Sequence, residues 1–190
     1  MIKIPTLYKS IEFIRPISWE EIFKNWEKNE APQESWKKHW TEIGCKSWKE
    51  WRSAFATPLK PEQQDWFLCE IKNPLEDSLN FYGVPSRAWI EKCYNGEKTK
   101  QIKDVLFSPV ISENQKILAI KNNFPKKTIL IGIVFKNKII IYEGQHRTCA
   151  LAIWDKKIPF KEKVFIALAK WKGEEFPAVG GKTRKISSKN

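Results

Sequence analysis

The most regular hydrophobic pattern of the chain lies in its last third. Residues 128–135 form an almost unbroken apolar run, and after a short polar turn a second apolar run covers residues 139–142. Two runs of β-branched residues separated by a short turn predict a β-hairpin. A polar turn follows, then an apolar helical stretch to about residue 154, and residues 164–169 predict a further strand. The pattern therefore predicts a hairpin, a turn, a helix and a strand in that order.

The N-terminal third has a helical pattern instead, built on tryptophan. Ser18-Trp19-Glu20-Glu21 and Ser47-Trp48-Lys49-Glu50 both fit a capping box, in which a serine and a glutamate satisfy free amides at the start of a helix. We expect helices over residues 18–29, 32–44 and 47–56. Six tryptophans recur at helical spacing in this block: Trp19, Trp26, Trp36, Trp40, Trp48 and Trp51. This register favours burial in a core over stacking on nucleic-acid bases.

Weaker signals fill the remaining positions. Alternation over residues 11–13 predicts a short strand, residues 61–71 predict a short helix, and residues 112–124 predict a helix that ends before Pro125. The fold class expected is α+β, with a small mixed sheet and a helical insertion over residues 18–56. We expect one domain over residues 1–171, with its core in residues 110–170, followed by a basic and flexible tail over residues 172–190.

Charge is distributed unevenly between the two halves. The net charge is +12, yet residues 1–95 hold 14 basic and 14 acidic side chains, so residues 96–190 carry the whole excess. Such a field attracts phosphates, nucleotides, DNA or RNA, although exposed lysines also serve solubility alone. No apolar run is long enough to cross a bilayer and the N-terminus has no secretory pattern, so we expect a cytoplasmic protein with no membrane partner. The four cysteines and two histidines have no metal-ligand spacing.

The residues most suited to chemistry stand between the hairpin and the helix. Glu143-Gly144-Gln145-His146-Arg147-Thr148 occupies the strand-to-helix junction. The first amides of a helix have no intrahelical partner and carry partial positive charge, so a glycine followed by His-Arg favours a phosphate cradle. The alternative is an ordinary corner with two solvated polar residues.

The order of these parts, together with Gly144, His146, Arg147 and Ala150, resembles the ParB/sulfiredoxin superfamily. The Arg15-Pro16 segment adds a weaker similarity. The resemblance covers residues 1–18 and 110–170, and the tryptophan-rich block has no counterpart. It implies a fold of ParB/sulfiredoxin type that holds nucleotide phosphates on Gly144, Gln145, His146, Arg147 and Thr148, with Arg15 as a further binding residue.

The superfamily divides by chemistry, and the turn can be compared with each branch. Sulfiredoxins have a reactive cysteine where this chain has Gln145, so sulfinic acid reduction is not expected. Free serine kinases of the superfamily have an aspartate where this chain has Glu143, which retains a carboxylate that can act in catalysis. Partition-type members bind CTP and continue into a DNA-binding domain, which we do not expect from the short basic segment after residue 171.

The sequence thus predicts a protein that binds a nucleoside phosphate, namely ATP, ADP or CTP with magnesium. Whether it is an enzyme, such as a phosphotransferase or a nucleotide hydrolase, stays open and depends on Glu143 as the catalytic residue. The alternative prediction is a nucleic-acid-binding or nuclease-like protein of ParB type that uses the same turn and the basic C-terminal half.

Overall fold

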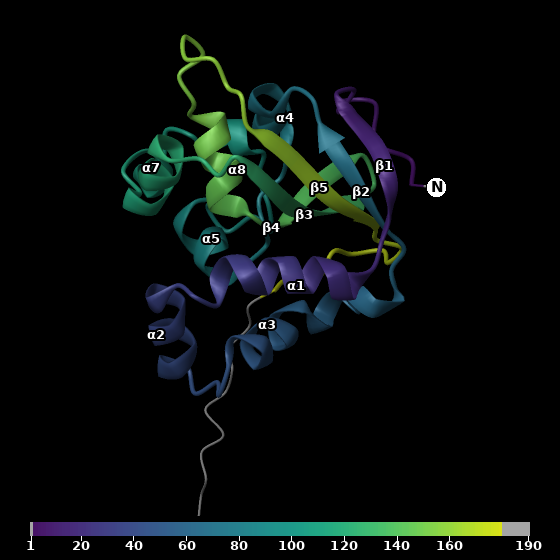
Figure 1. Cartoon of the computed structure of the whole chain (residues 1–190), viewed down its shortest axis with the longest axis vertical. Helices are drawn as coiled ribbons and strands as arrows, with labels where there is room; N and C mark the ends of the chain where they lie inside the picture. Colours follow the sequence, from purple (N-terminus) through teal and green to yellow (C-terminus); the bar gives the residue numbers. More distant parts are fainter. Residues whose placement is uncertain (1, 180–190) are drawn as a thin grey trace, which may run out of the picture.

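The computed structural model of the chain describes residues 2–179 and has an α+β fold built on one five-stranded mixed sheet (Figure 1). The strand order is β1-β2-β5-β3-β4. β3 and β5 run parallel, and every other neighbouring pair is antiparallel. The strands are β1 (Ile11–Ile17), β2 (Trp66–Ile71), β3 (Lys127–Phe135), β4 (Lys138–Glu143) and β5 (Lys163–Lys170). The predicted fold class is confirmed.

The hairpin expected near residue 136 is β3 and β4, and the helix that follows the polar turn is α8 (Gln145–Ala152). The other α-helices of the described residues are α1 (Trp19–Glu30), α2 (Glu34–Glu42), α3 (Trp48–Ala56), α4 (Pro74–Asn80), α5 (Arg87–Lys92), α6 (Pro109–Ser112) and α7 (Gln115–Asn122). Both predicted capping serines are N-caps, since Ser18 accepts from the Glu21 amide and Ser47 from the Glu50 amide, each at 3.1 Å.

The sheet separates two hydrophobic cores. Along β3, Leu130 and Val134 face one core, while Ile131 and Ile133 face the other, because successive side chains of a strand point to opposite sides. Figure 1 shows α1, α2 and α3 together on one side of the sheet, and α4 and α8 on the other. We call α1, α2 and α3 the tryptophan block.

Two sequence predictions are wrong. Residues 61–71 do not form a helix, because Trp66–Ile71 is the strand β2, which pairs with both β1 and β5. Residues 172–179 do not belong to a flexible tail, because Phe176 and Val179 are buried and Val179 bridges to Ser86. The rest of the expected tail, residues 180–190, lies outside the described residues. Within residues 2–179, every helix is too short or too polar to span a bilayer.

Candidate functional site

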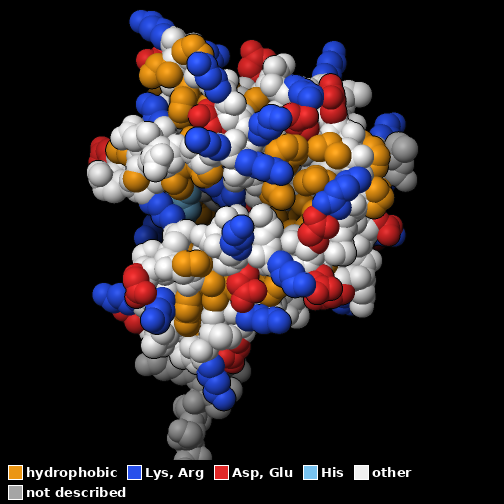
Figure 2. Space-filling view, in the orientation of Figure 1, with side chains coloured by type: hydrophobic (Ala, Val, Ile, Leu, Met, Phe, Trp, Pro, Cys, Tyr) orange, Lys and Arg blue, Asp and Glu red, His pale blue; other side chains and the backbone are white. Residues whose placement is uncertain are grey.

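A cavity of about 600 Å³ separates the tryptophan block from the opposite half of the molecule. Its walls come from α1, α2 and α3 on one side, and from α5, α7 and the turn before α8 on the other. Figure 2 shows a hollow on this face between α1 and the elements above it, with lysine or arginine side chains along its rim. The turn predicted as a phosphate cradle therefore opens into a cavity of a size typical of small-molecule sites.

Gly144 shapes this turn and caps α8. Its φ of 92° lies in the left-handed region, and a Cβ there would stand 2.5 Å from Cδ2 of Leu130. The Gly144 carbonyl accepts from the Thr148 amide at 2.8 Å and from the Thr148 hydroxyl at 3.1 Å. Gly144 lines the cavity, whereas Thr148 is fully buried and its hydroxyl serves the turn itself.

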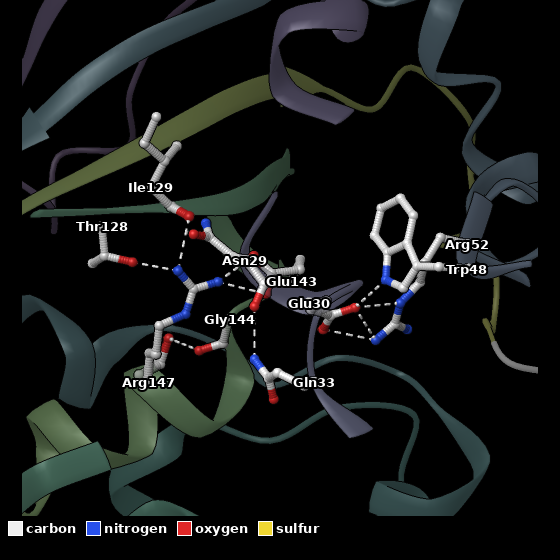
Figure 3. A network of polar contacts seen from close by, with 11 residues as sticks. Asn29, Glu30, Gln33, Trp48, Arg52, Thr128, Ile129, Glu143, Gly144 and Arg147 are labelled. Atoms are coloured by element: carbon white, nitrogen blue, oxygen red, sulfur yellow. Dashed lines mark hydrogen bonds and ion pairs between the residues drawn. The ribbon is translucent and has the colours of Figure 1, made fainter. Parts of the chain in front are cut away.

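Glu143 and Arg147 form a buried ion pair across the turn. Both oxygens of the Glu143 carboxylate accept from one terminal guanidinium nitrogen of Arg147, Nη2, at 2.5 Å (Figure 3). The other terminal nitrogen, Nη1, donates to the Thr128 hydroxyl and to the Ile129 carbonyl. The two side chains are 10% and 13% exposed. Burial raises the pKa of Glu143, while the adjacent Arg147 opposes that rise. Both residues line the cavity, and the charge of each is compensated by the other.

Gln145 supports the turn from within the protein. It is 5% exposed, and its side-chain oxygen accepts from the Val84 amide at 3.0 Å. Its nitrogen lies 3.4 Å from the Tyr94 hydroxyl and 3.9 Å from the Cys149 sulfur. Burial raises the pKa of Cys149, consistent with a packed thiol.

His146 lies on the cavity wall beside Trp89, with ring centroids 5.7 Å apart. Burial lowers its pKa to about 4, and the nearby cations Lys116, Arg147 and Arg52 act in the same direction. The imidazole is therefore neutral at pH 7, and a negative charge beside it would favour its protonation.

Arg15 is not brought to this site. It lies on the edge strand β1, its side chain is 46% exposed, and it pairs with Glu21 of α1. Among the described residues, those that line the cavity do not include Arg15. Of the residues predicted to bind phosphate, Gly144, Gln145, His146 and Arg147 meet at the cavity with Glu143, whereas Thr148 lies beneath them and Arg15 lies elsewhere.

A second ion pair faces the same cavity from the tryptophan block. Arg52 of α3 donates to both oxygens of Glu30 at 2.7 and 2.8 Å, and the Trp48 indole donates to Glu30 at 3.1 Å (Figure 3). The Arg52 guanidinium lies 3.7 Å from the ring centroid of Trp51. This pair was not predicted from the sequence, because its partners are 22 residues apart on two helices.

Lys116 of α7 is the other residue that was not predicted. It lines the cavity, and its Nζ lies 3.7 Å from the ring centroid of Trp36 across the cavity in α2. Among the described residues, no carboxylate lies within ion-pair distance of Lys116. Burial lowers its pKa, Glu30 and Glu143 oppose that shift, and Arg52 and Arg147 add to it. Nothing in the sequence around a single helical lysine indicates that it will line a cavity.

The residues of the site do not fit a magnesium ion held by the protein. Glu30 and Glu143 are the carboxylates on the cavity wall, and each is bound to an arginine. Residues 2–179 contain no cluster of three or more acidic, histidine or cysteine side chains suited to a metal. Magnesium favours carboxylate oxygens that are free to coordinate it.

Comparisons with protein-family models, with curated proteins and with solved structures gave no match to this chain. The site is therefore interpreted from its own geometry and charge.

Proposed function

We propose that this protein binds a nucleoside phosphate in the cavity, with the phosphates at the N-terminus of α8 and beside Lys116. The observation that carries the proposal is an excess of positive charge that the protein itself leaves uncompensated. Oriented helix amides and a buried cation are the groups that bind phosphate most effectively.

The charges on the cavity wall support an anionic ligand. The two carboxylates are neutralised by Arg52 and Arg147, and the remaining charged side chains are Lys92, Lys116 and Lys127. Lys92 and Lys127 are exposed, whereas Lys116 is partly withdrawn from water and stands close to both arginines. A cation in such surroundings is costly unless a negative charge joins it.

The dimensions and walls of the cavity support a nucleoside over a bare phosphate. About 600 Å³ exceeds what an inorganic phosphate needs, and aromatic side chains line it from both sides, Trp36 and Trp51 on one and Trp89 on the other. Ligand sites of this size with apolar walls and a few charged groups bind small organic molecules.

The proposal is for binding and does not extend to phosphoryl transfer. A catalytic Glu143 would have to hold a metal ion or accept a proton, and both of its oxygens already accept from Arg147. The same arrangement argues against a step through protein-bound magnesium.

Isothermal titration calorimetry with ATP, ADP and CTP tests the proposal, using wild type, Lys116→Met and Lys121→Met. Lys121 lies on the same helix and does not line the cavity, so its variant matches the loss of charge without touching the site. We expect wild type and Lys121→Met to bind at least one nucleotide, and Lys116→Met to bind it about 10- to 100-fold more weakly.

Equal affinities for the two lysine variants would contradict the assignment of the phosphates to Lys116. If wild type binds none of the three nucleotides but binds DNA in a salt-sensitive manner, the proposal is overturned in favour of a nucleic-acid-binding protein.

A further inference from the structure

The tryptophans of the block divide into two groups. Trp26, Trp36 and Trp51 line the cavity, with His39 beside the last two, whereas Trp19, Trp40 and Trp48 do not. Trp26 and Trp51 are also buried in the core. The ring centroids of Trp36 and Trp51 are 5.4 Å apart, and His39 lies 6.1 Å from Trp36 and 5.1 Å from Trp51. These three rings make a continuous aromatic wall across the cavity from α8.

Two indole N–H groups of the cavity residues have no acceptor. Among the described residues, the buried Nε1 atoms of Trp26 and Trp36 lack a hydrogen-bond partner. By contrast, the Trp48 indole donates to Glu30 and the Trp66 indole to the Pro61 carbonyl. Buried donors are nearly always paired, so Trp26 and Trp36 are exceptions among the residues that line the cavity.

Lys116 links this wall to the phosphate end of the site. Its ammonium lies on the face of Trp36 at 3.7 Å from the ring centroid. A cation–π contact is weaker than a charge-assisted hydrogen bond to phosphate. A phosphate near α8 would therefore draw Lys116 away from Trp36 and free the face of the indole for another flat group.

We propose that Trp36, supported by Trp51 and His39, binds the aromatic base of the ligand by stacking, and that the base takes the place of Lys116 on the face of the indole. This inference rests on the proposed function and extends it, since it assigns the tryptophan block to recognition of the base. The phosphates and the base are then held by opposite walls of one cavity.

Binding of ATP and of inorganic triphosphate, compared by calorimetry, separates the two ends of the ligand. For wild type we expect ATP to bind at least about tenfold more tightly than triphosphate, because stacking of the base adds to the phosphate contacts. Trp36→Ala should weaken ATP binding about tenfold and leave triphosphate binding unchanged. Trp36→Phe, which keeps a smaller aromatic ring, should bind ATP with an affinity between those of wild type and Trp36→Ala.

Tryptophan fluorescence gives a second readout, with Trp154→Phe as the matched control. Trp154 does not line the cavity, and its indole already donates to the Ile158 carbonyl. We expect ATP to quench the fluorescence of wild type and of Trp154→Phe by similar amounts, and that of Trp36→Phe by clearly less. Circular dichroism melting of each variant confirms that it is folded.

The possible results are distinct. Equal affinity of wild type for ATP and triphosphate would overturn the inference and leave phosphate binding intact. An equal loss of both ligands in Trp36→Ala would also overturn it, because Trp36 would then act only through Lys116 or the fold. If neither ligand binds wild type, the proposed function fails and the inference fails with it.

Discussion

The cavity contains two buried glutamate–arginine pairs that differ in how they are held. Glu30 and Arg52 come from two helices of the tryptophan block, and the guanidinium lies against aromatic rings, including Trp51 at 3.7 Å. Glu143 and Arg147 lie four residues apart on either side of Gly144, and Arg147 also donates to β3. The first pair fixes helix to helix, whereas the second fixes a turn to the sheet.

This comparison separates the role of the motif from the role of its surroundings. The Arg147 guanidinium is oriented by Glu143, Thr128 and the Ile129 carbonyl, so its charge is largely used to build the turn. Lys116, which belongs to no motif, is a partly buried cation that forms no ion pair among the described residues. The turn therefore sets the shape of the site, and α7 supplies the charge that a ligand can meet.

Breaking the Glu143–Arg147 pair should have the largest effect. Arg147→Ala leaves a buried carboxylate without its cation, and we expect a loss of about 3–5 kcal/mol in the free energy of unfolding. Urea denaturation measures this loss. The sequence alone suggests that Arg147 only contacts ligand, in which case its removal would leave stability unchanged.

The double variant Glu143→Leu/Arg147→Met provides the control. Removing both charges avoids an unpaired buried ion, so most of the lost stability should return. A double variant as unstable as Arg147→Ala would show that the pair is not what the single variant disrupts. Arg52→Ala should behave like Arg147→Ala, because Glu30 would be left unpaired in the same way.

Gly144→Ala should have the next largest effect, about 2–3 kcal/mol, from a strained φ and a Cβ pressed against Leu130. Gly44→Ala is the matched control, since Gly44 has a φ of 84° and no atom lies within 4 Å of the point where its Cβ would stand. It should cost only about 1 kcal/mol, from strain alone. Equal thermal shifts of the two variants would show that the contact with Leu130 is not limiting at Gly144.

The fold was predictable where local signals were strong. The capping boxes at Ser18 and Ser47 predict two helix starts, and the apolar runs around residue 136 predict β3 and β4. β2 was not predictable as a strand, because Trp66–Ile71 has no alternation and is buried by pairing with β1 and β5, which are distant in sequence. The conformation of this segment is therefore set by long-range strand pairing and not by its local sequence pattern.

The site was predictable in part for the same reason. A glycine between a strand and a helix is a local signal, and Gly144 is indeed the left-handed N-cap of α8. The roles of Lys116 and the Glu30–Arg52 pair depend on helices that meet only in the folded chain, so no spacing in the sequence reveals them. The interpretation of Arg15 as a site residue came from its neighbours in sequence, and the fold directs that side chain to Glu21 instead.

The smallest expected effect concerns the proton on His146. Its pKa of about 4 lies below the value of about 6.5 in the unfolded chain, so the unfolded state binds the proton first and stability falls as pH drops from 6.5 towards 4. An anion beside Lys116, Arg147 and Arg52 would raise this pKa, so wild type at about pH 6 should take up a proton at His146 on binding triphosphate, in addition to any proton that the ligand itself takes up. Calorimetry in two buffers of different ionisation enthalpy measures the uptake, and His146→Asn should reduce it to the contribution of the ligand. His39→Gln leaves a single histidine signal for NMR. If His146 titrates near pH 6.5 in the free protein, then neither burial nor the cations Lys116, Arg147 and Arg52 lower its pKa, and the cavity is less positive than its arrangement of charges implies.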